Sequence, residues 1–273
     1  MNIQPAVSLW NYNHYHPVSS LEEILVELQK YHLGVELWNS WHRDEGLYLP
    51  EQQKRLQQAL NGMPVSLHAA IGNNEMDFLD RQIDAAAALG AKVLVIHADN
   101  ISTEDRSLDF ELADKIVSRG KNRGVQIALE NGQLPVLKKA LEAIDDLRIC
   151  LDIGHVYLTD DPLKSFLETF QDRIVHLHLQ DILSEAEETL VGEGGIIRDH
   201  YTPGSGGIPD ADWALLFRAL EKVDYRGMAV FEVQPRRPLQ TTLSGTRFLR
   251  RFGEIGPGLE KDGKDVFAES PLN

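Results

Sequence analysis

Cysteine, positive charge and long apolar runs are all scarce in this sequence, and each scarcity excludes a class of protein. Cys150 is the one cysteine among 273 residues, so no disulfide can form within the chain. It lies in an apolar segment, which is typical of a small core residue in a reducing compartment. No run approaches the roughly 18 apolar residues of a membrane span, and MNIQPAVSLW lacks the basic start and apolar stretch of a signal peptide. We therefore expect a cytoplasmic protein that does not act at a membrane.

Positive charge is outweighed by negative charge. The chain has 27 Lys and Arg against 42 Asp and Glu, a formal net charge of -15 and a pI near 5.1. Phosphate backbones and anionic lipids repel such a protein. We therefore expect a small-molecule substrate rather than nucleic acid, and we leave open whether the chain forms a homo-oligomer.

A phosphate-binding GxGxxG motif is missing as well. The sequence instead alternates strand-like apolar runs with amphipathic, helix-like stretches. The strand-like runs are residues 6–10, 34–38, 65–71, 92–98, 125–131, 148–155, 174–181 and 227–233. Eight such units without that motif favour a (β/α)8 TIM barrel, in the α/β class, over an open doubly wound sheet.

Glycine and proline indicate where helices begin and end. Pro50 can occupy the first turn of a helix that stops at Gly62, and Gly90 and Gly124 should end two more helices. No linker divides the chain, so we expect one barrel domain over residues 1–255 and a C-terminal tail over residues 256–273. The longest connection, residues 182–208, contains GEGG and TPGSGG and is interpreted as a lid.

Charged side chains close several of the strand-like runs. In a barrel of this class, the carboxyl ends of the strands build the active site. IALEN ends near Glu130, CLDIGH contains Asp152, HLHLQD contains His178 and VFEV contains Glu232. Buried strands do not tolerate charge without a partner, and three carboxylates with one imidazole suit Mn²⁺, Mg²⁺ or Co²⁺. These four residues are therefore predicted to hold a divalent metal ion.

Alternation along each strand separates the interior of the barrel from its outside. Ala128 and Glu130 share one face of their strand, and Cys150 and Asp152 share one face of theirs. These faces should line the interior of the barrel. Leu129 and the other leucines between them should face the helices.

Four histidines surround the predicted metal ligands in the sequence. His68 and His97 end the third and fourth runs, in SLHA and VIHA. They could hold a second metal ion or grip substrate hydroxyl groups, and neither alternative is favoured. His155 lies in the turn beyond the sixth run and His200 lies on the long connection, positions that favour a functional role over a structural one.

Three further polar residues have structural explanations. His176 is one layer deeper than His178 and is interpreted as a core residue or a partner of the metal ligands. Asp181 should orient His178 or cap the following turn. Glu36 is the weakest candidate, because a hydrogen bond that closes the barrel would explain it equally well.

Taken in order, several of these motifs resemble the xylose isomerase-like TIM-barrel superfamily, which contains sugar isomerases, sugar epimerases and endonuclease IV. The motifs are SLHA, VIHA, ALEN, LDIGH, HLQD, RDHYTPGSGG and FEV, over about residues 5–252. Each motif alone is weak, whereas the ordered set is specific to the superfamily. The resemblance implies a TIM barrel with a metal-dependent active site.

Two branches of that superfamily imply two chemistries. In the ketose 3-epimerase branch, the four positions that carry the predicted ligands bind one divalent metal, commonly Mn²⁺, and the two glutamates act on opposite faces of the substrate. Endonuclease IV uses the same four positions. It adds residues matching His68 and His97 for one zinc, and residues matching His155 and His200 for another.

The chain departs from endonuclease IV at one position. That enzyme has an aspartate two residues before the loop histidine, where this chain has Arg198; Asp199 is adjacent but would be out of register. A cation at this position would oppose a third zinc. It could instead grip an anionic or polyhydroxy substrate.

The leading interpretation is a metal-dependent isomerase or epimerase of a sugar, sugar phosphate, polyol or related keto compound. Glu130 or Glu232 would take a proton and the other would return it, through a metal-stabilised enediolate. The alternative is a zinc-dependent phosphodiesterase of the endonuclease IV type that acts on abasic DNA. The histidines favour this alternative, whereas the negative charge and Arg198 oppose it. A non-catalytic sugar-binding barrel is the third class.

Overall fold

Eight parallel strands close into a barrel in which each strand pairs with the next and β8 pairs back with β1. The computed structural model describes residues 1–10, 21–38, 47, 49–70, 74–159, 161–183, 199–233 and 237–256. The strands are β1 (Asn2–Ser8), β2 (Gly34–Trp38), β3 (Val65–His68), β4 (Val93–Ile96), β5 (Gln126–Glu130), β6 (Arg148–Asp152), β7 (Ile174–Leu179) and β8 (Arg226–Phe231). The predicted (β/α)8 barrel is confirmed.

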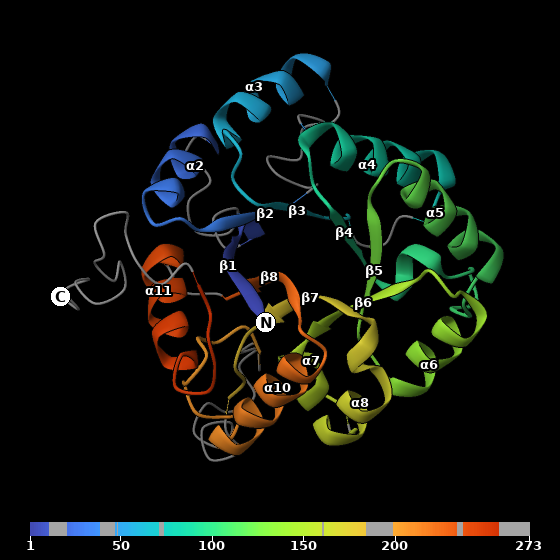
Figure 1. Cartoon of the computed structure of the whole chain (residues 1–273). Helices are drawn as coiled ribbons and strands as arrows, with labels where there is room; N and C mark the ends of the chain where they lie inside the picture. The colour runs from blue at the N-terminus through green and yellow to red at the C-terminus, as the bar shows by residue number, and fades with distance from the viewer. Residues whose placement is uncertain are drawn as a thin grey trace, which may run out of the picture.

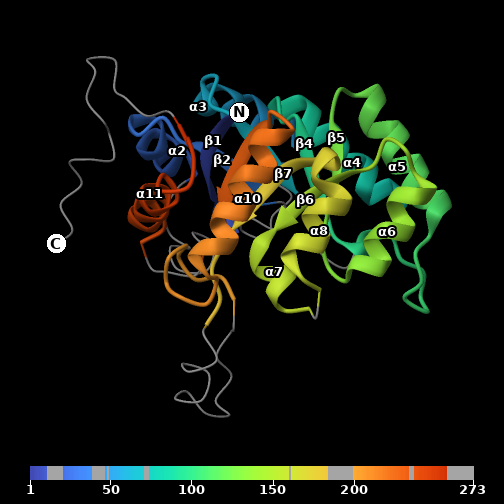
Figure 2. The same cartoon turned by 60° about the horizontal axis from the view of Figure 1, so that its bottom comes forward.

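Helices surround the barrel on all sides (Figure 1). The long ones are α2 (Leu21–Lys30), α3 (Pro50–Leu60), α4 (Met76–Leu89), α5 (Phe110–Asn122), α6 (Leu134–Ala143), α8 (Leu163–Phe170), α10 (Asp210–Lys222) and α11 (Pro238–Leu249). Short ones are η2 (Ala98–Ile101), α7 (Ile153–Tyr157) and η3 (Gln171–Arg173). Figure 2 shows α10, α8 and α6 in succession along one flank of the barrel. No helix in the described parts of the chain is long and apolar enough to cross a membrane.

The predicted helix ends are confirmed by the backbone. Pro50 occupies the first turn of α3, and this helix ends immediately before a left-handed pair of residues, Asn61 and Gly62. Gly90 follows α4 with a φ of 82°, and its N–H bonds the carbonyls of Ala86 and Ala87. A side chain at that φ would be strained, so glycine ends the helix there at little cost.

The interior and exterior layers of the barrel are separate in the way that strand alternation predicts. Leu129 and its neighbours of the same orientation belong to the large core between strands and helices. A small cluster made of Val93, Val95, Ala128 and Cys150 lies apart from it, inside the barrel. The interior faces of β5 and β6 end in Glu130 and Asp152. The same alternation therefore places these two carboxylates at the carboxyl-terminal mouth of the barrel.

One irregularity sets which residues of β7 face the interior. The pairing of β6 with β7 shifts between Ile149 and Cys150, so that Cys150 pairs with His176 and Asp152 pairs with His178. A β-bulge of this kind turns a strand without breaking the sheet. The shift therefore brings His178 level with Asp152.

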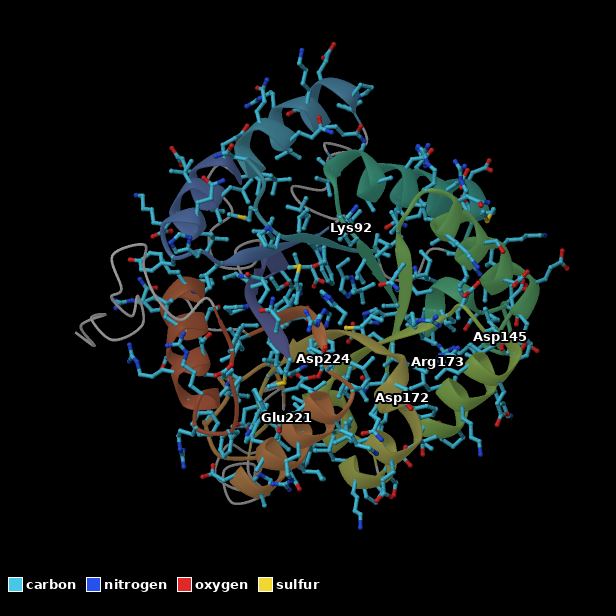
Figure 3. All side chains as sticks on the ribbon, in the orientation of Figure 1. Lys92, Asp145, Asp172, Arg173, Glu221 and Asp224 are labelled. Atoms are coloured by element: carbon cyan, nitrogen blue, oxygen red, sulfur yellow. The ribbon has the colours of Figure 1, made fainter. Side chains whose placement is uncertain are left out.

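The amino-terminal end of the barrel carries charged residues but none of the predicted site. Figure 3 labels Lys92, Asp172 and Asp224 at this end, on the connections that lead into β4, β7 and β8. The predicted ligands close the opposite, carboxyl-terminal end. The predicted tail lies outside the described residues beyond Gly256, as do residues 184–198 of the connection interpreted as a lid.

Candidate metal centre

The four residues predicted to bind a metal ion converge at the carboxyl end of the barrel. Glu130 and Asp152 end β5 and β6, His178 lies in β7, and Glu232 directly follows β8. One ligand atom of each lies within 4.8 Å of those of the other three, and all four residues are buried. Four strands that are separate in the sequence therefore contribute to one site.

The distances in this group fit the coordination sphere of a divalent ion. Nδ1 of His178 lies 3.0 Å from Oε2 of Glu232, 3.3 Å from Oε2 of Glu130 and 4.0 Å from Oδ2 of Asp152. Ligands at right angles around an ion at about 2.1 Å lie about 3 Å apart. Nδ1 of His178 is buried and makes no hydrogen bond of good geometry with any described residue. The donors present therefore fit a divalent cation.

Charge in this group is balanced between carboxylates and imidazoles. Burial raises the pKa of Glu130, but the positive charge of His97 and His178 outweighs burial and holds the pKa well below its usual value. Burial lowers the pKa of His178, and Cys150 with the surrounding carboxylates raises it well above its usual value. The pKa of Asp152 is raised, chiefly by burial. A divalent cation would take over the charge that protonated imidazoles otherwise supply.

A second group forms around Glu130 on the side of β3 and β4. Oε2 of Glu130 lies 3.3 Å from Nε2 of His68 and 3.1 Å from Nε2 of His97, and these two nitrogens are 3.2 Å apart. Nδ1 of His68 lies 2.8 Å from the carbonyl of Ala69, which leaves the Nε2 lone pair of a neutral ring facing the group. Burial lowers the pKa of His97, and Glu130 raises it above its usual value. The group can hold a cation or a substrate hydroxyl, as the sequence suggested.

A third group forms at the mouth from His155, Asp199 and His200. Oδ2 of Asp199 lies 3.7 Å from Nε2 of each histidine, and Nδ1 of His155 lies 2.9 Å from Oε1 of Glu130. Burial lowers the pKa of His155, but Asp152 and Glu130 raise it to about 10. His155 lies on the short helix α7 rather than in an open turn.

The expectation that Asp199 would be out of register was wrong. Its carboxylate lies between the two histidines, where we expected no acidic group. His200 has a positive φ of 63°, a local change of backbone direction that residue counting does not reveal. Arg198 lies outside the described residues. Its expected opposition to a third zinc therefore stays a prediction, although Asp199 offers an acidic group beside the two histidines.

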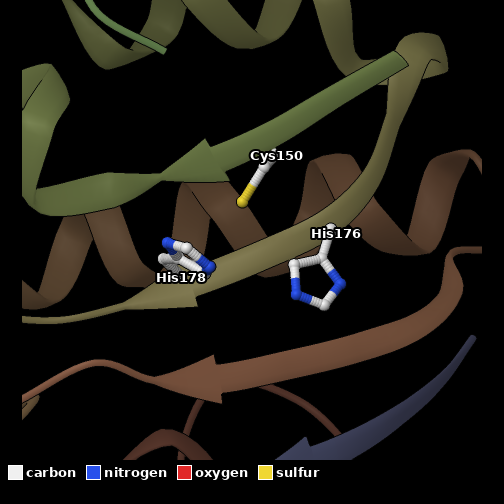
Figure 4. A group of neighbouring side chains, drawn as sticks. All are labelled: Cys150, His176 and His178. Carbon is white, nitrogen blue, oxygen red and sulfur yellow. The ribbon is translucent and has the colours of Figure 1, made fainter. Parts of the chain in front are cut away.

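Beneath the metal group lies a buried polar layer. Figure 4 shows Cys150 pointing from one strand towards His176 and His178 on the next, and these three also have ligand atoms within 4.8 Å of one another. Oε1 of Glu36 lies 3.0 Å from Nε2 of His178, and Oε2 lies 2.9 Å from Nε2 of His176. A neutral imidazole has one lone pair. When His178 binds a metal ion as a neutral ring, a proton on Nε2 would face Glu36 and the lone pair would lie on Nδ1, towards the carboxylates above.

Replacing Glu36 by glutamine should weaken metal binding by about 10- to 100-fold, the usual effect of losing a partner of a metal-ligating histidine. The shape of the side chain is kept, but the negative charge facing Nε2 of His178 is lost. Metal affinity measured by competition with a chelator checks this. Ser66→Ala is the control, because it removes a 3.0 Å hydrogen bond to the same carboxylate and leaves its charge. Equal metal affinity in Glu36→Gln and the wild type would contradict the expected role.

Two polar residues of the site were missed in the sequence. The amide of Asn131 accepts a hydrogen bond from the N–H of Asp152 (2.6 Å) and donates one to its carbonyl (3.0 Å). Gln180 donates to the carboxylate of the same residue. Both residues directly follow a strand that carries a predicted ligand, and this adjacency was the available signal.

A family model described as "Xylose isomerase-like TIM barrel" matches residues 32–252. The match covers most of the chain, which therefore belongs to the xylose isomerase-like TIM-barrel family. The resemblance seen in the ordered motifs is confirmed.

Proteins similar to this chain include a dehydratase and an epimerase. An inosose dehydratase of Histophilus somni is 26% identical over 208 residues, which cover 63% of this chain and 69% of the relative. The structure of a 3-keto-D-glucoside 4-epimerase from E. coli has a TM-score of 0.64 at 18% identity, and covers 91% of this chain and 99% of its own. The IOLI protein, solved with a zinc atom, has a TM-score of 0.70 at 17% identity. The match covers 93% of this chain and 100% of the IOLI chain. Both solved structures share the fold of this chain.

Proposed function

We propose that this chain is a metal-dependent enzyme that removes a proton from the carbon beside the carbonyl group of a sugar or cyclic polyol ketone. The observation that carries the proposal is the convergence of two carboxylates on one imidazole. An oxygen of Glu130 and an oxygen of Glu232 both lie within 3.3 Å of Nδ1 of His178. Two carboxylates are therefore available as acid–base groups beside one bound substrate, and we infer that they act on its opposite faces.

The roles of the residues follow from this placement. Glu130 or Glu232 takes the proton, the C–H electron pair forms a carbon–carbon double bond, and the carbonyl oxygen becomes negative. Return of a proton to the same carbon by the other carboxylate gives an epimer. Return to the former carbonyl carbon gives an isomer, if the proton of the neighbouring hydroxyl moves to the negative oxygen. Glu36 and Asn131 hold His178 and Asp152 in position while this happens.

Glu130, Asp152, His178 and Glu232 would hold the metal ion. When bound, this ion supplies positive charge to the carbonyl oxygen as negative charge develops there. Mn²⁺, Mg²⁺ and Co²⁺ suit three carboxylates and one imidazole, and the zinc atom of the IOLI protein adds Zn²⁺ to the candidates.

Dehydration is the second candidate, because the Histophilus somni relative is an inosose dehydratase. It shares the first step, removal of the proton beside the carbonyl. It differs afterwards, since the hydroxyl group on the next carbon leaves as water after protonation and an unsaturated ketone remains. Reaction in D2O therefore tests the shared step, and the product distinguishes the two outcomes.

The experiment uses enzyme stripped of metal and reloaded with Mn²⁺, Mg²⁺, Co²⁺ or Zn²⁺. Each form is incubated in D2O with inosose, D-fructose and D-tagatose, and the products are followed by NMR. We expect metal-dependent deuterium incorporation beside the carbonyl, together with an epimer, an isomer or an unsaturated ketone. Full turnover by the metal-free enzyme would overturn the proposal.

The endonuclease-like alternative is tested in the same preparation. The arrangement of His155, Asp199 and His200 favours it, because that group offers a further metal position. Cleavage of an abasic duplex together with three zinc ions per chain would replace the proposed reaction by phosphodiester hydrolysis. We expect neither, because a net charge of -15 opposes a DNA backbone.

A further inference from the structure

The side chain of Gln180 joins two parts of the site that lie on different segments of the chain. Its Nε2 donates a hydrogen bond to Oδ2 of Asp152, and its Oε1 accepts one from the backbone N–H of His200. Gln180 directly follows β7 and is fully buried. One amide therefore connects the end of β6, the end of β7 and the segment that carries Asp199 and His200.

Both hydrogen bonds require an amide. The carboxylate of Asp152 can only accept, the N–H of His200 can only donate, and glutamine offers one donor and one acceptor on neighbouring atoms. A glutamate would lose the donor and bring a second negative charge against Asp152. A methionine of similar size would offer neither bond.

Gly154 provides the space that this amide occupies. A Cβ at Gly154 would lie 2.6 Å from Cδ of Gln180 and 2.7 Å from its Cγ and Oε1. Gly154 lies in α7 and has no positive φ, so its backbone conformation would accept another residue. The glycine in LDIGH is therefore explained by the position of Gln180.

Hydrogen bonds made by Asp181 anchor the same segment but do not involve the four predicted metal ligands. The backbones of Asp181 and Tyr201 exchange hydrogen bonds of 2.7 and 3.0 Å. The carboxylate of Asp181 accepts hydrogen bonds from the N–H groups of Gly204, Gly206 and Ile208. Gln180 differs from these because its second bond goes to Asp152.

We infer that Gln180 is a positioning residue, which holds the Asp152 carboxylate in its ligand position and ties it to the Asp199–His200 segment. The inference rests on the proposed function, because it takes Asp152 as a ligand of the ion. Without the amide, the carboxylate loses a buried donor and can turn away from the site. The N–H of His200 loses its acceptor at the same time.

The test compares Gln180→Met with Gln82→Met. Gln82 is also fully buried, and its Oε1 accepts a 2.8 Å hydrogen bond from the N–H of Ala70, so both variants lose a buried amide and both should melt at a lower temperature. For Gln180→Met alone, we expect Mn²⁺ and Zn²⁺ affinity to fall by about 10- to 100-fold, as for other residues that orient a metal ligand. We also expect faster hydrogen exchange of the His200 amide in this variant alone. Unchanged metal affinity in Gln180→Met would overturn the inference.

A second variant removes the fit without removing the amide. As a single variant, Gly154→Ala should weaken metal binding, because the added methyl group displaces the amide of Gln180. In a Gln180→Ala background no amide remains to displace, so Gly154→Ala should cause no further loss of metal affinity. Additive losses in the double variant would also overturn the inference. If the wild type binds no metal, the proposed function fails, whereas the exchange rate of the His200 amide still reports on the link to Gln180.

Discussion

Replacing Glu130 by glutamine should lower kcat by about 10²- to 10⁴-fold, because a general base contributes this much and the variant keeps the shape without the basicity. Oxygens of Glu130 lie within 3.3 Å of nitrogens of His68, His97, His155 and His178, so the loss of charge affects every group of the site. Steady-state kinetics on the substrate found by NMR, with metal content measured in parallel, check this expectation. Glu232→Gln should have an effect of the same order.

The matched control is Glu142→Gln on α6. Its side chain is 65% exposed, so the same chemical change there should leave kcat unaltered. If the two carboxylates act on opposite faces, each site variant should still exchange the proton of one epimer with D2O while turnover is lost. Full activity of either site variant, with metal bound, would refute the role of these glutamates.

Replacing Asp181 by alanine should lower the free energy of unfolding by about 2–4 kcal/mol, because a buried N–H group that loses its acceptor costs about 1–3 kcal/mol and the partly buried ones cost less. Of the N–H groups that Asp181 binds, that of Ile208 is buried and the others are partly buried or exposed. The Asp181 carboxylate is fully buried and accepts four backbone hydrogen bonds, of 2.8 to 3.2 Å, from Ile182, Gly204, Gly206 and Ile208. Urea unfolding measures the change. Activity should fall as well, because this connection carries His200.

Asp146→Ala is the control for that experiment. Asp146 forms an exposed ion pair with Lys121, and exposed pairs contribute at most about 1 kcal/mol. The control should therefore unfold within about 0.5 kcal/mol of the wild type. A loss below 1 kcal/mol for Asp181→Ala would mean that water replaces the carboxylate and that the connection does not depend on it.

Much of the site could be predicted because barrel strands repeat one local rule. Apolar runs that end in a carboxylate or an imidazole identified Glu130, Asp152, His178 and Glu232, and the fold brings all four together. The rule does not extend to connections. Asp199 was misplaced because its position depends on the backbone at His200 and on the bonds that anchor residues 201–208.

The partners of the ligands were predicted only in part, because His176 was interpreted as a core residue or a partner, whereas Asn131 and Gln180 were missed. Glu36 was the weakest candidate in the sequence, yet in the structure it contacts both His176 and His178. These contacts depend on the shift of pairing between β6 and β7, which decides which residues of β7 face inwards. A shift of one residue leaves the sequence pattern unchanged and moves every side chain to the other face.

The sequence by itself determined the barrel and the chemical type of the site, because the alternation of apolar runs and the residue at the end of each run are local properties. The tertiary structure alone decided how the candidates group. It placed Glu130 in contact with four histidines, brought Asp199 between His155 and His200, and linked that segment to Asp152 through Gln180. These contacts join residues far apart in the chain, and their distances follow from strand register and loop anchoring rather than from spacing along the sequence.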